Sequence, residues 1–95
     1  MLTGKQRAGL RSIGSRLDTI GQIGHGGITP EVEQTVLSAL QARELVKFRV
    51  LETCPLSARE AADTLAASLG CEVVQVIGYR FVLFLQKEEG SAYEL

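Results

Sequence analysis

The sequence contains no tryptophan, one histidine, two cysteines and two prolines among its 95 residues. So few cysteine and histidine residues exclude a disulfide framework and argue against a protein-made metal site, and we expect no cofactor. No apolar run approaches the ~20 residues of a membrane span, and residues 1–11 lack the apolar centre of a signal peptide. These absences favour a soluble, cytoplasmic protein with no membrane partner and no metal.

Charge is nearly balanced overall but is unevenly distributed along the chain. Ten Lys and Arg residues oppose eleven Asp and Glu residues, for a net charge of −1. Residues 1–50 carry a net charge of +3 and residues 51–95 a net charge of −4. The pI near 5.8 argues against a general polyanion binder, whose domains usually lie above about 9. A local basic patch with an acidic opposite side is compatible with these numbers.

Three helix starts are marked in the sequence. Residues 3–6 and 57–60 fit capping boxes, and Thr29-Pro30 fits an N-cap followed by proline at the first helical position. Gly70 suits the end of the third helix. The apolar positions expected to be buried are Leu10, Ile13 and Leu17 in the first helix, Val32, Val36, Ala39 and Leu40 in the second, and Ala61, Leu65 and Leu69 in the third.

Four strands are predicted between and after these helices, over residues 19–23, 45–51, 72–77 and 81–86. In the second, alternation places Lys47 and Arg49 on the face opposite Val46, Phe48 and Val50. The order α-β-α-β-α-β-β favours an α/β two-layer sandwich of helices on a mainly parallel sheet. We expect one domain over residues 1–87 and a flexible polar tail over residues 88–95.

A glycine-rich loop, Gly24-His25-Gly26-Gly27, follows the first strand and directly precedes a helix N-terminus. Unpaired N–H groups there attract phosphate, and glycines let a sugar-phosphate backbone approach. The G-x-x-G pattern clamps the backbone in single-stranded RNA modules. The alternative is a strand-to-helix turn that needs flexible residues. A dinucleotide fingerprint would need glycine at Thr29, and a P-loop would need Lys and Ser or Thr after the glycines.

The remaining candidates for chemistry are weaker. Cys54 and Cys71 are expected to be small core residues and not reactive thiols. No nucleophile elbow is present and the carboxylates are dispersed, so an enzyme is not expected. Cations flank the first helix's apolar stripe, Lys5 and Arg16 on one margin and Arg7 and Arg11 on the other. These cations are compatible with two interpretations, a solvent-exposed margin of the helix or a binding surface.

Several segments together resemble the CRM domain, named for chloroplast RNA splicing and ribosome maturation. They are residues 2–7 (LTGKQR), 22–29 (QIGHGGIT), 44–47 (ELVK), Val50-Leu51 with Cys54-Pro55, and 72–78 (EVVQVIG). The resemblance covers about residues 2–86 and is nearest to the stand-alone bacterial YhbY-like members. It implies a fold with three helices and a mixed four-stranded sheet, similar to the C-terminal domain of translation initiation factor 3.

The resemblance also implies RNA binding, with ribosomal RNA and precursors of the large ribosomal subunit as partners during ribosome assembly. The loop and neighbouring cations would carry it. The candidate RNA-binding residues are Lys5, Arg7, Arg11, Gly24, His25, Gly26, Gly27, Lys47, Arg49 and Arg80. An alternative function is a protein–protein module that docks onto a ribosomal or assembly protein through the acidic C-terminal half.

The sequence departs from the family's usual pattern at two places beside the loop. His25 stands where a lysine is usual, and Asp18-Thr19 stands where Lys-Pro is common. Both departures remove positive charge, since histidine is mostly neutral near pH 7. RNA binding is therefore expected to be weaker, or more sensitive to pH, than in lysine-bearing relatives.

Overall fold

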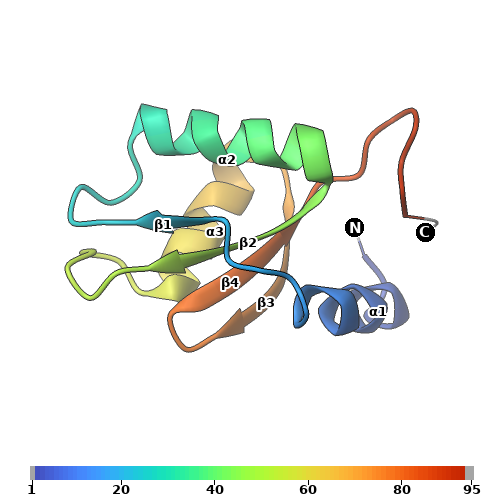
Figure 1. The fold of residues 1–95 in the computed structure, drawn as a ribbon, viewed down its shortest axis with the longest axis horizontal. Coiled ribbons are helices and arrows are strands. Elements are labelled where there is room, and N and C mark those ends of the chain that lie inside the picture. The colour runs from blue at the N-terminus through green and yellow to red at the C-terminus, as the bar shows by residue number, and fades with distance from the viewer. Residues whose placement is uncertain (1, 94–95) are drawn as a thin grey trace.

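The computed structural model describes residues 2–93, which form three helices and four strands in the predicted order (Figure 1). The elements are α1 (Gly4–Gly14), β1 (Gly21–Ile23), α2 (Pro30–Arg43), β2 (Leu45–Val50), α3 (Ala58–Leu69), β3 (Glu72–Ile77) and β4 (Arg80–Phe84). The main difference from the prediction is a shorter first strand, which begins at Gly21 and not at Thr19.

The four strands form one sheet in the order β1-β2-β4-β3. β1 and β2 are parallel, whereas β2 pairs with β4, and β4 with β3, in antiparallel register. The α/β class with a mixed four-stranded sheet and three helices is confirmed. The expectation of a mainly parallel sheet is wrong, because β3 and β4 are joined by a short hairpin that reverses the chain. The likeness to translation initiation factor 3 stays a prediction.

The helix ends lie where the capping signals predict. Thr3 and Ser57 each form a complete capping box, and the Thr29 hydroxyl accepts from the Val32 N–H at 3.2 Å. Gly70 ends α3 with φ of 69°. This left-handed conformation explains why glycine stands at that position.

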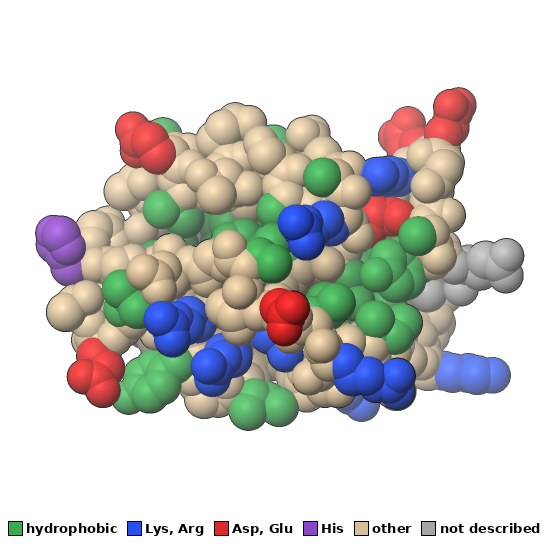
Figure 2. All heavy atoms as spheres, viewed as in Figure 1, with side chains coloured by type: hydrophobic (Ala, Val, Ile, Leu, Met, Phe, Trp, Pro, Cys, Tyr) green, Lys and Arg blue, Asp and Glu red, His purple; other side chains and the backbone are tan. Residues whose placement is uncertain are grey.

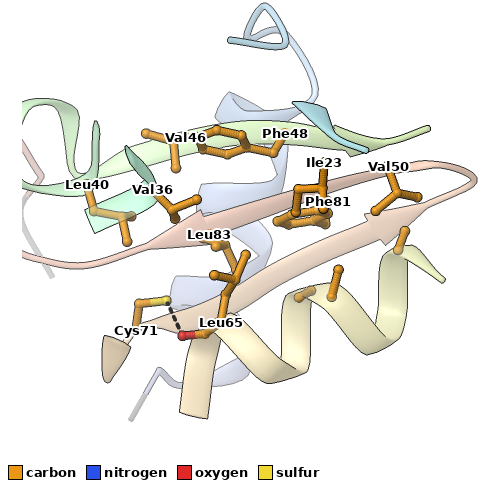
Figure 3. Packing of buried hydrophobic residues seen from close by; sticks show 13 residues of the cluster. Ile23, Val36, Leu40, Val46, Phe48, Val50, Leu65, Cys71, Phe81 and Leu83 are labelled. Carbon is orange, nitrogen blue, oxygen red and sulfur yellow. Dashed lines mark hydrogen bonds between the residues drawn. The ribbon is translucent and has the colours of Figure 1, made fainter. Parts of the chain in front are cut away.

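The larger core lies between the sheet and the helices α2 and α3 (Figure 3). Ile23, Phe48 and Phe81 come from three different strands, and the Phe48 and Phe81 rings stack with centroids 6.2 Å apart. The Phe48 ring passes so close to Gly21 that a Cβ there would lie 2.6 Å from it. Glycine at position 21 is therefore needed for the ring to occupy this place.

The opposite face of the sheet carries a second core, formed with α1, so helices cover both faces and the predicted two-layer arrangement is wrong. Leu10 packs there against residues of β2, β3 and β4, namely Leu45, Val74, Val82 and Phe84. A Cβ at Gly14 would lie 3.0 Å from a Val82 methyl, so glycine brings the end of α1 close to the sheet. Leu10 and Gly14, one turn apart, continue the buried stripe. The prediction that Ile13 is buried is wrong, since its side chain is 41% exposed.

Glu44 is a charged residue in the core, only 1% exposed, with φ of 67°. Its carboxylate accepts from the Lys87 N–H at 3.0 Å, the Ser91 hydroxyl at 2.6 Å and the Ala92 N–H at 2.7 Å. Burial by itself raises the pKa of Glu44, but these hydrogen bonds bring it below its usual 4.5. Glu44 thus holds the segment 87–92 against the junction between α2 and the start of β2.

The C-terminal segment is further held by Tyr93, whose ring lies edge-on to Phe84 at 5.5 Å. The predicted domain boundary at residue 87 and the flexibility of the tail stay predictions. Residues 94–95 of that tail lie outside the described residues. Among residues 2–93, no helix is long and apolar enough to cross a membrane.

Candidate nucleic-acid interface

Strand register places four exposed residues in one row across the whole sheet. Gln22 of β1 pairs with Arg49 of β2, Arg49 pairs with Arg80 of β4, and Arg80 pairs with Ile77 of β3. We call these four residues the front row. They lie on the same face as α1, but α1 covers only the other end of that face, over Leu45 and Phe84. The front row is therefore open to solvent.

Lys47 continues the front row into a shallow hollow on this face. It lies two residues before Arg49 on β2, and its Nζ donates to the Ser15 carbonyl at 3.4 Å. Lys47 and Arg80 line the hollow together with Ser15, Gln75 and Ile77. Figure 2 shows Lys and Arg side chains gathered over the lower part of the molecule, with one acidic side chain among them.

Lys47, Arg49 and Arg80 are each held by neutral acceptors. Arg49 donates from Nη2 and Nε to the Gln22 Oε1, at 3.0 and 3.3 Å, and the Arg80 Nε donates to the Thr19 hydroxyl at 3.2 Å. Within residues 2–93, no carboxylate forms an ion pair with Lys47, Arg49 or Arg80. Like charges directly opposite one another destabilise a sheet. A cluster of cations without ion-pair partners attracts a polyanion.

The loop of residues 24–27 leaves the sheet immediately after β1, beside the front row (Figure 1). The Gly27 N–H donates to the Gly24 carbonyl at 3.0 Å, which closes a tight turn. Gly27 has φ of 66° and is buried, and a Cβ there would lie 3.4 Å from Pro55. The loop is thereby fixed at Gly27.

The tip of the same loop faces solvent. His25 and Gly26 are exposed, and their amides donate to no other atom of the described chain. A Cβ at Gly26 would meet nothing closer than 3.9 Å. Two free amides without obstructing side-chain bulk at Gly26 suit a phosphate oxygen.

The partial positive charge at the N-terminus of α2 is already compensated by residues of the chain. Pro30 has no N–H, Thr29 caps Val32, and Glu31 and Glu33 add negative charge to the first turn. The sequence prediction combined the loop with this helix end as one phosphate site. The geometry favours the loop amides alone.

Tyr79 lies beside the front row at the turn between β3 and β4. Gly78 starts this turn with φ of 57°, and the Tyr79 carbonyl accepts from the Val50 N–H of β2 at 2.8 Å. Its side chain is 58% exposed. Tyr79 is not among the residues predicted from the sequence, although an aromatic next to an arginine in a turn is a usable signal. Gln22 and Ile77 were not predicted either, because their places in the front row depend on strand register.

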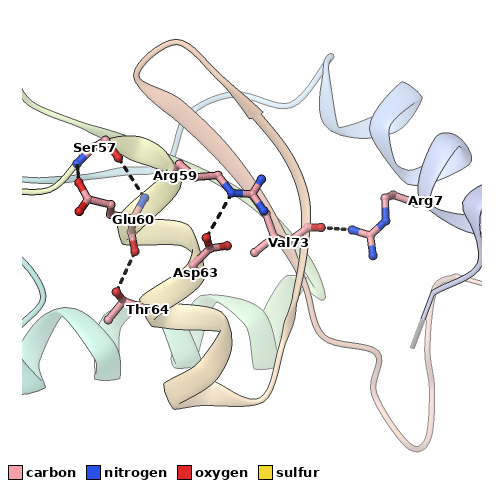
Figure 4. A network of polar contacts seen from close by, with 7 residues as sticks. All are labelled: Arg7, Ser57, Arg59, Glu60, Asp63, Thr64 and Val73. Atoms are coloured by element: carbon pink, nitrogen blue, oxygen red, sulfur yellow. Dashed lines mark hydrogen bonds and ion pairs between the residues drawn. The ribbon is translucent and has the colours of Figure 1, made fainter.

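The predicted cations of α1 lie apart from the front row. Arg7 donates to the Val73 carbonyl and lies 4.0 Å from the Glu72 carboxylate, so it joins α1 to β3 (Figure 4). Arg11 lines the same edge of the sheet, whereas exposed Lys5 lies beside Tyr93. β3 and β1 are the two opposite edges of the sheet. The structure therefore places Lys47, Arg49 and Arg80 on one face of the sheet, with the Gly24–Gly27 loop following the edge strand β1, whereas Lys5, Arg7 and Arg11 belong to α1 and Arg7 lies at the opposite edge.

Both cysteines belong to the larger core, on the face of the sheet opposite the front row. Cys71 is a core residue, as predicted, and burial raises the pKa of its thiol to about 11. Cys54 is half-buried against the larger core. In the described part of the chain, no group of three or more His, Cys, Asp or Glu residues could hold a metal ion.

Known proteins are similar to this chain in both sequence and fold. The CRS1 / YhbY (CRM) domain family matches residues 2–84. A Bacillus subtilis (strain 168) protein named probable RNA-binding protein YqeI is 38% identical over 95 residues, covering 100% of this chain and 99% of the relative. The solution structure of the hypothetical protein SAV1595 from Staphylococcus aureus matches with a TM-score of 0.84 and 40% identity. The match covers 100% of this chain and 99% of SAV1595, whose description proposes RNA binding.

Proposed function

The chain belongs to the CRS1 / YhbY (CRM) domain family, and from this membership we propose that it is an RNA-binding protein that acts by binding and not by catalysis. One observation carries the proposal at the level of residues. Lys47, Arg49 and Arg80 form a cationic surface without acidic partners among residues 2–93, next to a loop with two exposed amides. Phosphate contacts of this kind supply most of the affinity in protein–nucleic acid binding.

We further propose that the RNA is ribosomal, as part of precursors of the large subunit in the cytoplasm. This choice rests on what the resemblance to stand-alone CRM proteins implies. The test is a filter-binding or mobility-shift titration with fragments of large-subunit ribosomal RNA, against transfer RNA and duplex DNA of matched length. Preference for a ribosomal fragment supports the proposal. Equal affinity for all three would contradict the ribosomal target, and binding to none would contradict RNA binding and leave protein docking as the better function.

Neutralising Arg49 is expected to weaken binding to every RNA by about the same factor, roughly three- to fivefold in 0.1–0.15 M salt. Arg49→Gln removes one phosphate contact, so the slope of log K against log salt should fall by about 0.7–0.9. Arg43→Gln is the matched control, because Arg43 is an exposed arginine at the end of α2, which packs on the other face of the sheet. Equal losses of affinity in both variants would show that RNA binding depends on the net charge of the protein and not on the position of Arg49.

Neutralising Asp18 is expected to strengthen RNA binding about two- to fivefold. Asp18 is exposed and adjoins Thr19, which holds Arg80, so its charge reduces the positive potential of the front row. Asp18→Asn keeps the shape of the side chain and removes this charge. Asp63→Asn, on α3, changes the net charge equally and should leave affinity nearly unchanged. Affinities measured at low salt check both variants, and no gain for Asp18→Asn would contradict the placement of the RNA.

A further inference from the structure

We propose that Tyr79 stacks on an unpaired base of the bound RNA, so that this face selects RNA with unpaired nucleotides over continuous duplex. The inference rests on the proposed function and specifies which part of an RNA the face receives. In this arrangement Ile77 extends the apolar surface beside Tyr79. Arg80 and Arg49 bind the phosphates next to the stacked nucleotide.

The exposure of Tyr79 and Ile77 is the first observation. They are 58% and 63% exposed, the highest values among the large hydrophobic side chains exposed in the described chain. Ile77 directly precedes the two-residue turn, Tyr79 is its second residue, and Ile77 is the direct cross-strand partner of Arg80. Apolar side chains gathered at one exposed point mark a contact surface.

The second observation is that the position of Tyr79 is fixed while its side chain is free. Its carbonyl accepts from the Val50 N–H at 2.8 Å, which ties the turn to β2. The ring makes no stacking contact with another ring of the described residues. Because the backbone is already anchored, only the rotation of the Tyr79 side chain has to be ordered when a base stacks on the ring.

The third observation is the chemistry of the neighbours. Tyr79 directly precedes Arg80, whose guanidinium is held by Thr19 and has no acidic partner within residues 2–93. A base offers an apolar π-face and its nucleotide a phosphate, so one nucleotide can use both groups at once. Bases within a duplex are stacked on their neighbours and cannot reach a side chain in this way. The face therefore fits loops, bulges and single strands.

The chain itself provides a direct probe of the stacking. It contains no tryptophan and two tyrosines, Tyr79 and Tyr93. Tyr93→Phe keeps the ring that packs on Phe84 and leaves Tyr79 as the only tyrosine fluorophore. Titration with an RNA hairpin that carries an unpaired loop should quench this fluorescence, after correction for RNA absorption. The same stem closed as a blunt duplex should quench it little.

Affinity measurements with the hairpin RNA complete the test. Tyr79→Ala should weaken binding at least about fivefold, Tyr79→Phe should stay within about twofold of wild type, and neither should change the salt slope. Ile13→Ala removes another exposed apolar side chain and should have no effect. Circular dichroism confirms that each variant is folded.

The outcomes separate this inference from the function on which it rests. If hairpin RNA binds with its dependence on Arg49 intact, but Tyr79→Ala binds equally well or duplex quenches equally, the stacking role of Tyr79 is wrong and RNA binding stands. If the wild-type chain binds no RNA, the proposed function fails and this inference fails with it.

Discussion

Replacing Gly26 by aspartate is expected to weaken RNA binding about tenfold without disturbing the fold. Gly26 is exposed at the tip of the loop, and a Cβ there would meet no atom within 3.4 Å. The new carboxylate would lie beside the free amides of His25 and Gly26, where we propose that a phosphate binds. Repulsion between two charges a few ångströms apart near a protein surface is large enough for this loss.

Gly26→Asn is the matched control, because asparagine has the size of aspartate without its charge. Its affinity should be at least about fivefold higher than that of Gly26→Asp. If the two variants bind equally, repulsion is not the cause, and if both bind like wild type the loop does not touch RNA. Gly27 is unsuitable for this experiment, since φ of 66° and the nearby Pro55 would strain any side chain there.

Glu44→Gln is expected to lower the melting temperature by more than about 5 °C at pH 7. Both carboxylate oxygens of Glu44 accept hydrogen bonds, Oε2 from Lys87 and Ser91 and Oε1 from Ala92. Glutamine replaces one acceptor by an NH₂ group, which leaves a donor without its partner in a buried place. Glu88→Gln, an exposed residue of the same segment, should leave the melting temperature unchanged. Equal melting temperatures for Glu44→Gln and wild type would contradict the role of these bonds.

The same carboxylate predicts how stability depends on pH. The pKa of Glu44 in the folded chain is below its usual 4.5, because its hydrogen bonds outweigh the effect of burial. Its contribution is therefore fully present above about pH 4.5 and is lost as the pH falls through the lower, folded-state pKa. Urea unfolding at pH 7 and near pH 3 should show a smaller loss for Glu44→Gln than for wild type. Parallel losses would mean that other carboxylates account for the acid sensitivity.

The helices of this fold could be predicted because their signals are local. The capping boxes at Thr3 and Ser57 and the N-cap at Thr29 each involve residues three positions apart. The burial of Ile13 was predicted wrongly. The three- and four-residue spacing of apolar side chains does not show that Gly14, one turn after Leu10, is the residue that packs on the sheet.

The candidate site could be predicted only in part. Alternation in β2 gives the shared face of Lys47 and Arg49, but the front row depends on the strand order β1-β2-β4-β3. That order is set by packing between segments far apart in the sequence. Without it, Arg80 and Arg49 cannot be recognised as neighbours. Arg7 was grouped with the loop for the same reason, although the structure uses it to join α1 to β3.

The burial of Glu44 could not be predicted either, because it depends on residues far away in the sequence. A glutamate between a helix and a strand is ordinarily exposed. Its partners lie 43 to 48 positions further along the chain, so no local pattern indicates that it is buried.

The pairing of Arg49 with Arg80 has a consequence for protein engineering. Two like charges opposite one another cost stability, and Gln22 and Thr19 offset that cost only with neutral hydrogen bonds. Substitutions that remove either charge would therefore be enriched in a library selected for thermostability alone, and depleted in one selected for affinity. At this row of the sheet, a redesign for stability alone would therefore weaken the RNA binding that we propose.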